Sequence, residues 1–116
     1  MRKLITLFSL LVISLSVFSV NITSGTKLYM KPNSNWRQAD ARFAAYYYDS
    51  GGGNAWTDMA YVEDDGGYPV YEAIAPSGTW TNVIFVRMNP GTTTNNWTNK
   101  WSQTDNLTYD GTNNCF

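Results

Sequence analysis

After its first twenty residues, the chain alternates apolar and polar side chains over short runs that are separated by turn residues. Alternation with a period of two predicts half-buried β-strands. We expect strands at 27–30, 41–48, 56–62, 68–74 and 82–88, and a last strand that begins at residue 107. Clusters of Gly, Asn, Asp and Pro between the runs indicate turns, and the segment 63–67 is predicted to be a hairpin loop. The sequence therefore predicts an all-β chain.

The spacing of these strands bears on their architecture. Strands that recur every 10–15 residues or so, with turns between them, favour an antiparallel β-sandwich of a single domain. A small barrel has the same punctuation and remains an alternative. The apolar run 83–86 is not interrupted by polar residues, which predicts a central strand that is buried on both faces.

The N-terminus has the features of a secretory signal. Arg2 and Lys3 precede an apolar run over residues 4–20, and small residues stand at its end. The run is shorter than the roughly 20 predominantly apolar residues of a comfortable membrane span. We expect a signal peptide in residues 1–19, cleaved near Ser19, and a secreted module in residues 20–116; an uncleaved membrane anchor is the alternative.

The strand at 41–48 separates its aromatic side chains between two faces. Phe43 and Tyr47 fall on one face, which we expect to be core, whereas Tyr46 and Tyr48 fall on the other, about 7 Å apart. Trp56, which follows the glycine-rich turn, could complete a platform of three rings. Sugars bind such platforms because their C–H faces are apolar; simple cross-strand packing is the alternative.

A second candidate region spans residues 87–101. It combines two indoles, three amides and two cations, and such amides and cations donate hydrogen bonds to sugar hydroxyls. The alternative is a long loop that is held down by its own tryptophans. The members of this region are Arg87, Asn89, Asn95, Asn96, Trp97, Lys100 and Trp101. The residues predicted to bind carbohydrate are Tyr46, Tyr48, Trp56, Arg87, Trp97 and Trp101.

Composition narrows the class of function. All five Trp and all eight Tyr lie after the predicted signal, more aromatic surface than so small a core can hide, which indicates a contact surface. The net charge is −1, and no basic stripe is present, so nucleic acid and anionic membranes are poor partners. The absence of histidine excludes His-based triads and most zinc sites.

The acidic residues offer little for catalysis or metal binding. Nine carboxylates leave a glycosidase pair conceivable, but a short sandwich has little depth for a catalytic cleft. The segment 64–66 supplies too few oxygens for calcium and is predicted to be a solvated turn. We therefore predict a binding protein that is not an enzyme and that needs no cofactor and no metal.

Cys115 is the only cysteine, so an internal disulfide is impossible. Free cysteine is among the most buried residue types, and we predict that its side chain is buried as a small apolar group. An intermolecular disulfide is the alternative.

Five stretches of the sequence resemble a known family. Residues 27–36, 41–48 and 55–59, together with the more specific stretches 80–90 and 95–104, are similar to the starch-binding carbohydrate-binding modules of the family 25 and 26 type. Such modules are appended to bacterial α-amylases and other extracellular proteins. The similarity extends over nearly all of the chain after the signal, and residues 1–116 leave no room for a catalytic domain beside the module.

The resemblance implies an immunoglobulin-like β-sandwich that binds α-1,4-linked glucan. By motif, the sugar-binding tyrosine pair and the following tryptophan become Tyr46, Tyr48 and Trp56; a second alignment places the first tyrosine at Ala44. We expect a monomeric module whose partner is starch, glycogen or a malto-oligosaccharide. The alternative function is a secreted structural or adhesive module that contacts another protein.

Overall fold

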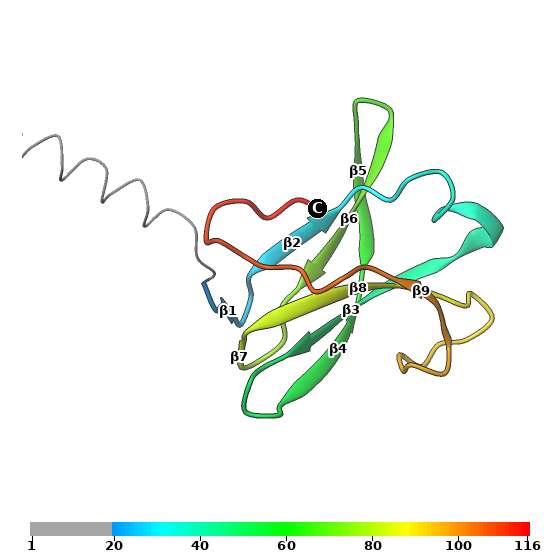
Figure 1. Cartoon of the computed structure of the whole chain (residues 1–116). Helices are drawn as coiled ribbons and strands as arrows, with labels where there is room; N and C mark the ends of the chain where they lie inside the picture. Colours follow the sequence, from blue (N-terminus) through cyan, green and yellow to red (C-terminus); the bar gives the residue numbers. More distant parts are fainter. Residues whose placement is uncertain (1–19) are drawn as a thin grey trace, which may run out of the picture.

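The computed structural model describes residues 20–116, and the predicted signal segment 1–19 lies outside the described residues. Two antiparallel sheets account for most of the fold, with strand orders β2-β6-β5 and β4-β3-β8-β9 (Figure 1). A further short pair joins β1 to β7, and one 3-10 turn, η1 (Gln38–Asp40), precedes β3. The strands are β1 (Ile22–Thr23), β2 (Lys27–Met30), β3 (Arg42–Tyr48), β4 (Asn54–Asp58), β5 (Ala60–Asp65), β6 (Tyr68–Ile74), β7 (Thr79–Trp80), β8 (Asn82–Met88) and β9 (Lys100–Gln103).

The main core lies between the two sheets. Phe43, Tyr47 and Phe85 project into it from the four-stranded sheet, and Leu28 and Ala73 project into it from the three-stranded sheet. Each large side chain of this kind stabilises the fold by about 1.5–3 kcal/mol when it leaves water. The predicted all-β class and the antiparallel sandwich are confirmed, whereas the immunoglobulin-like designation remains a prediction.

The opposite face of the four-stranded sheet carries a second, smaller apolar cluster. Its buried members are Ala44 of β3 and Ile84, Val86 and Met88 of β8. Because β8 is buried on both faces, its sequence shows no apolar–polar alternation, and the prediction of a central strand is confirmed. We call the face that carries the smaller cluster the outer face of the four-stranded sheet.

The predicted strand 56–62 is wrong, because the chain changes sheets in the middle of it. β4 pairs with β3 in one sheet, and β5 pairs with β6 in the other. The crossover passes through Met59, which is buried and donates its N–H to the Phe43 carbonyl at 2.9 Å. Because the crossover takes only one residue, apolar and polar residues still alternate almost regularly over 56–62. The sequence pattern therefore predicts one strand where the structure has two.

The predicted hairpin loop 63–67 is too long. β5 continues through Asp65, and only Gly66 and Gly67 make the turn, both with positive φ (61° and 89°). The β5–β6 hairpin projects from the body of the molecule at the top of Figure 1. Glu63 and Asp65 therefore stand on a strand edge rather than in a turn.

The C-terminal part also differs from the prediction. Lys100–Gln103 form β9, which is not among the predicted strands. The region after residue 107, where a last strand is predicted, makes only isolated bridges, Val83 with Leu107 and Tyr29 with Cys115. The second bridge is parallel: Tyr29 donates its N–H to the Asn114 carbonyl at 2.7 Å and accepts the Phe116 N–H at 2.9 Å. Over residues 20–116, no helix has the length and apolar character needed to cross a membrane.

The prediction that Cys115 is buried is wrong. Its thiol is exposed and unpaired. The next residue, Phe116, turns inward and packs against Phe85, with ring centroids 5.8 Å apart. Because neighbouring side chains of an extended segment point to opposite sides, Cys115 faces away from the core.

Candidate functional site: an aromatic cluster

Four aromatic side chains meet on the outer face of the four-stranded sheet, and we call them the aromatic cluster. They are Tyr46 and Tyr48 of β3, Trp56 of β4 and Trp97 of the loop between β8 and β9. β-sheet register brings the first three together, because Tyr46 is paired directly with Trp56. Directly opposed side chains on one face of a sheet lie close enough for their rings to touch.

Tyr46 occupies the centre of the cluster. Its ring centroid lies 5.7 Å from that of Tyr48 and 4.9 Å from those of both Trp56 and Trp97. The two indoles lie 4.8 Å apart. Tyr46 and Tyr48 are nearly parallel, at 29°, whereas Tyr46, Trp56 and Trp97 are inclined to one another by 57–65°. The rings are therefore not coplanar and do not form a flat platform.

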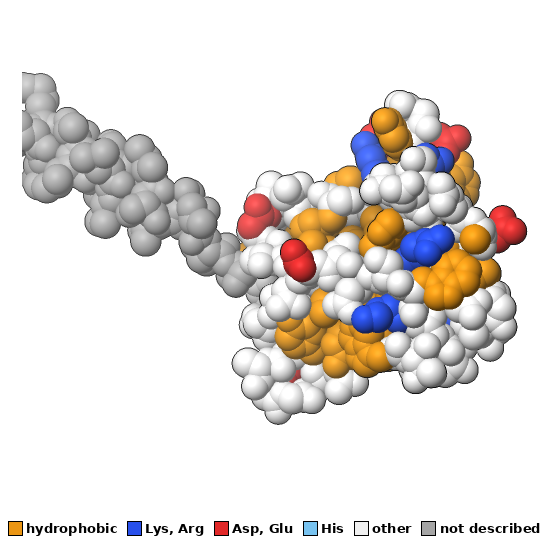
Figure 2. Space-filling model, turned by 45° about the vertical axis from the view of Figure 1, so that its right-hand side comes forward, with side chains coloured by type: hydrophobic (Ala, Val, Ile, Leu, Met, Phe, Trp, Pro, Cys, Tyr) orange, Lys and Arg blue, Asp and Glu red, His pale blue; other side chains and the backbone are white. Residues whose placement is uncertain are grey.

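The floor of the cluster is the smaller apolar cluster of the outer face. Tyr46, Tyr48 and Trp56 pack against Ala44, Ile84, Val86 and Met88 and are half-buried, while Trp97 remains 40% exposed. Hydrophobic side chains reach the surface in patches, with Lys and Arg side chains among them (Figure 2). The rings thus have rigid backing on one side and water on the other, which suits them to contact a ligand.

Polar groups border the cluster on the side of β9. The Lys100 ammonium lies 5.5 Å from the Trp97 ring centroid and donates a hydrogen bond to Gln103 Oε1 at 2.7 Å. Lys100 is paired with Met88, a member of the outer apolar cluster. An ammonium and an amide offer donors and an acceptor to ligand hydroxyls beside the rings.

Arg87 and Trp101 lie apart from the aromatic cluster. Arg87 stands between Val86 and Met88 on β8, so alternation turns it to the opposite face of the sheet. There its guanidinium donates to the carbonyl oxygens of Trp36 and Gln38, each at 2.8 Å, and lies 4.7 Å from the ring centroid of Trp101. Of the six residues predicted to bind carbohydrate, the structure brings four together and separates these two.

Arg42 lies beside the aromatic cluster, although it is not among the six residues predicted to bind carbohydrate. It shares its strand face with Tyr46 and Tyr48 and reaches the loop that carries Trp97. Its even position on β3 predicts this face from the sequence. The hydrogen bonds to the loop depend on the tertiary structure and cannot be predicted from alternation.

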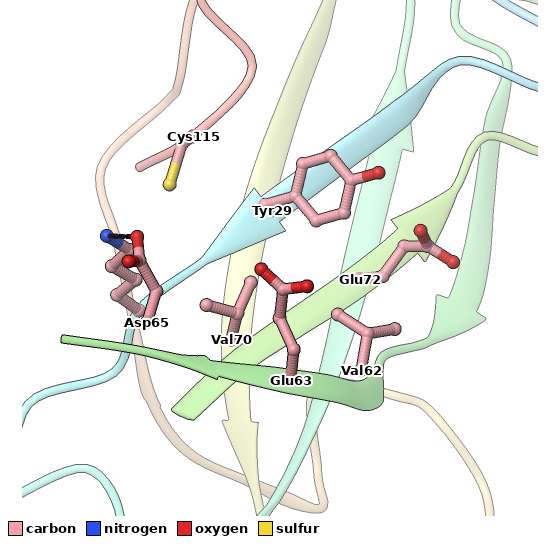
Figure 3. A pocket seen from close by; sticks show the side chains of 8 residues that line it. Tyr29, Val62, Glu63, Asp65, Val70, Glu72 and Cys115 are labelled. Carbon is pink, nitrogen blue, oxygen red and sulfur yellow. Dashed lines mark hydrogen bonds and ion pairs between the residues drawn. The ribbon is translucent and has the colours of Figure 1, made fainter. Parts of the chain in front are cut away.

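A hollow of about 440 Å³ lies on the outside of the three-stranded sheet. Tyr29 of β2, Glu63 of β5 and Glu72 of β6 point to the same side of that sheet, and Cys115 borders the hollow (Figure 3). Desolvation, reinforced by the Glu72 and Glu63 carboxylates, raises the pKa of the Tyr29 phenol. Asp65 is paired with Lys31.

Metal binding finds no support in this hollow or elsewhere in the described chain. Within residues 20–116, no group of three or more His, Cys, Asp or Glu side chains is arranged to hold a metal ion. The aromatic cluster is therefore the main candidate for a functional site.

The chain matches no protein-family model, and comparisons with the curated proteins and with the solved structures found no match.

Proposed function

We propose that residues 20–116 form a non-catalytic carbohydrate-binding module that holds α-1,4-linked glucan on the aromatic cluster. One observation carries the proposal: Tyr46, Tyr48, Trp56 and Trp97 meet on one sheet face with centroid separations of 4.8–5.7 Å between neighbours. Aromatic faces pack against the apolar C–H faces of sugar rings. The polar groups of Lys100 and Gln103, beside the cluster, can form hydrogen bonds with the hydroxyls of the sugar.

The inclination of the rings favours an α-linked over a β-linked glucan. A β-1,4-glucan is a flat ribbon whose sugar rings stack best on coplanar aromatic side chains. An α-1,4-glucan coils, so successive sugar rings turn relative to one another. The angles of 57–65° among Tyr46, Trp56 and Trp97 suit the coiled chain.

Affinity electrophoresis in gels with and without soluble starch tests the proposal. We expect starch to retard the wild-type protein, with a dissociation constant of about 10 µM to 1 mM, because a shallow surface must offset the cost of immobilising the ligand. Trp97→Ala should lose most of the retardation. Trp101→Ala is the matched control, because Trp101 has a similar exposure (43%) but stacks on Arg87 away from the cluster.

Unchanged mobility of the wild-type protein in starch would remove the proposal. A Trp101→Ala variant that loses as much retardation as Trp97→Ala would move the site away from the aromatic cluster. If starch fails to bind and light scattering gives a doubled mass that falls on Tyr46→Ala, the adhesive alternative is favoured. Reducing sugar released from α-glucans on prolonged incubation would contradict a non-catalytic role.

A further inference from the structure

The ring of Trp97 differs from the other three in the way it is held. Tyr46, Tyr48 and Trp56 project from paired strands, whereas Trp97 belongs to an irregular segment, residues 89–99, between β8 and β9. The ends of this segment are closed by the Asn89 N–H, which donates to the Asn99 carbonyl at 2.9 Å. Closure of the ends does not by itself fix the position of a side chain near the middle.

Arg42 supplies the contacts that fix this segment to the sheet. Its Nε donates to the Thr92 carbonyl at 2.7 Å, and its Nη2 donates to Thr92 Oγ1 at 3.2 Å and to the Thr94 carbonyl at 2.9 Å. Its Nη1 donates to Asn95 Oδ1 at 2.5 Å. The guanidinium thus bonds to three residues of the segment, Thr92, Thr94 and Asn95. The Arg42 side chain is only 23% exposed.

The adjacent strand β4 completes the arrangement. Asn95 Nδ2 donates to Asp58 Oδ1 at 2.8 Å, and the same carboxylate oxygen lies 3.6 Å from Arg42 Nη1. Asn95 therefore lies between a cation of β3 and an anion of β4, two residues before Trp97 in the chain. The planar fork of arginine makes several hydrogen bonds in fixed directions, which a lysine ammonium cannot reproduce.

From these contacts we propose that Arg42 is a positioning residue of the aromatic cluster: it fixes residues 92–95 so that Trp97 is held against Trp56 and Tyr46. The claim that this affects glucan binding rests on the proposed function; the claim that it places Trp97 does not. Arg42 touches no ligand in this proposal and acts only through Trp97.

The test compares Arg42→Lys with Arg37→Lys. Arg37 is the matched control, because its side chain is exposed and its Nε bonds to the Asn33 carbonyl of its own segment, at 3.4 Å. Two indoles 4.8 Å apart and inclined by 63° couple their transitions, which gives a paired positive and negative band in circular dichroism. Trp97→Phe assigns that band pair to Trp56 and Trp97.

We expect Arg42→Lys to abolish or strongly weaken the band pair and to reduce starch affinity by about fivefold to tenfold, while Arg37→Lys leaves both unchanged. A general loss of structure would instead lower the melting temperature and flatten the whole near-ultraviolet spectrum. Asn95→Ala removes the hydrogen bonds of Asn95 to Arg42 and Asp58 and should weaken the band pair in the same way. This variant tests the proposal even if Arg42→Lys folds poorly.

A full band pair in both Arg42→Lys and Asn95→Ala overturns the proposal. Loss of the band pair with unchanged starch affinity would support the placement of Trp97 by Arg42 and would overturn the claim that this placement affects glucan binding. If the wild-type protein does not bind starch, the proposed function fails, and the band pair alone then decides whether Arg42 positions Trp97.

Discussion

Trp56 and Trp97 lie with their indole centroids 4.8 Å apart, although one ring belongs to a strand and the other to an irregular loop. The contact joins a regular element to a segment that the sheet itself does not order. Tyr46 lies 4.9 Å from each of them and supports both. The stability of the outer face and its ability to bind a ligand are therefore expected to depend on the same side chains.

Tyr46→Ala should weaken both the fold and the binding of starch. Tyr46 contacts three rings and covers the apolar floor formed by Ile84 and Val86, so its removal leaves a cavity that costs about 2 kcal/mol or more of unfolding free energy. Urea denaturation measures the cost. Tyr46→Phe is the control and should stay within about 0.5 kcal/mol of the wild type; an equal loss in both variants would show that the hydroxyl, and not the ring, matters.

Tyr47→Phe should raise the stability of the protein. Tyr47 is fully buried on the inner face, and its hydroxyl has no hydrogen-bond partner. An unsatisfied buried hydroxyl costs about 1 kcal/mol or more, which the phenylalanine avoids. Thermal unfolding should then show a rise of about 4–8 °C in melting temperature. A fall in melting temperature would indicate that the hydroxyl has a favourable partner in solution.

Alkaline pH should destabilise the protein, in part through the same residue. Burial raises the pKa of the Tyr47 phenol above its ordinary value of 10.0. The folded state then keeps a proton that the unfolded state loses, so the stabilising effect is complete below about pH 10 and decreases as the pH rises further. Urea unfolding measures the free energy of unfolding at each pH between about pH 9 and pH 11.5. This free energy should fall less steeply with pH in Tyr47→Phe than in the wild type, by up to about 1.4 kcal/mol per pH unit. Identical slopes would contradict this origin.

Cys115 should react with a thiol reagent in the native protein. The thiol is exposed at the border of the hollow on the three-stranded sheet, so no unfolding is needed for access. Labelling of one thiol per chain, followed by mass spectrometry without denaturant, is the expected result, and Cys115→Ser should remain unlabelled. A requirement for urea before labelling would mean that the C-terminal segment buries the side chain.

The sequence was informative wherever one strand stays within one sheet. The alternation along β3 correctly separated Phe43 and Tyr47 from Tyr46 and Tyr48, because burial on each face follows the pleat. It failed at Met59, where the chain passes between sheets without a turn residue. It also missed β9, whose polar residues resemble the surrounding loop.

The candidate site could be predicted only in part, because closeness in sequence is not closeness in space. Trp97 and Trp101 are four residues apart, yet the irregular backbone at the start of β9 sends them to different neighbours, and the register shift between Arg87 and Met88 lies at this point. The parity of Arg87 along β8 is readable from the sequence. The bulge that separates the two tryptophans is not, since it depends on how β8 and β9 pair.

The parallel bridge between Tyr29 and Cys115 has a mechanical consequence. β2 and the C-terminal segment run in the same direction, and Tyr29, Lys31 and Phe116 supply the N–H groups that join them. A force that pulls the two ends of the domain apart would slide these segments past each other, so it would load their hydrogen bonds in shear. Bonds loaded in shear share the force and must yield together, whereas bonds that are unzipped yield singly. A domain clamped in this way is suited to resist unfolding when a force acts on its two ends.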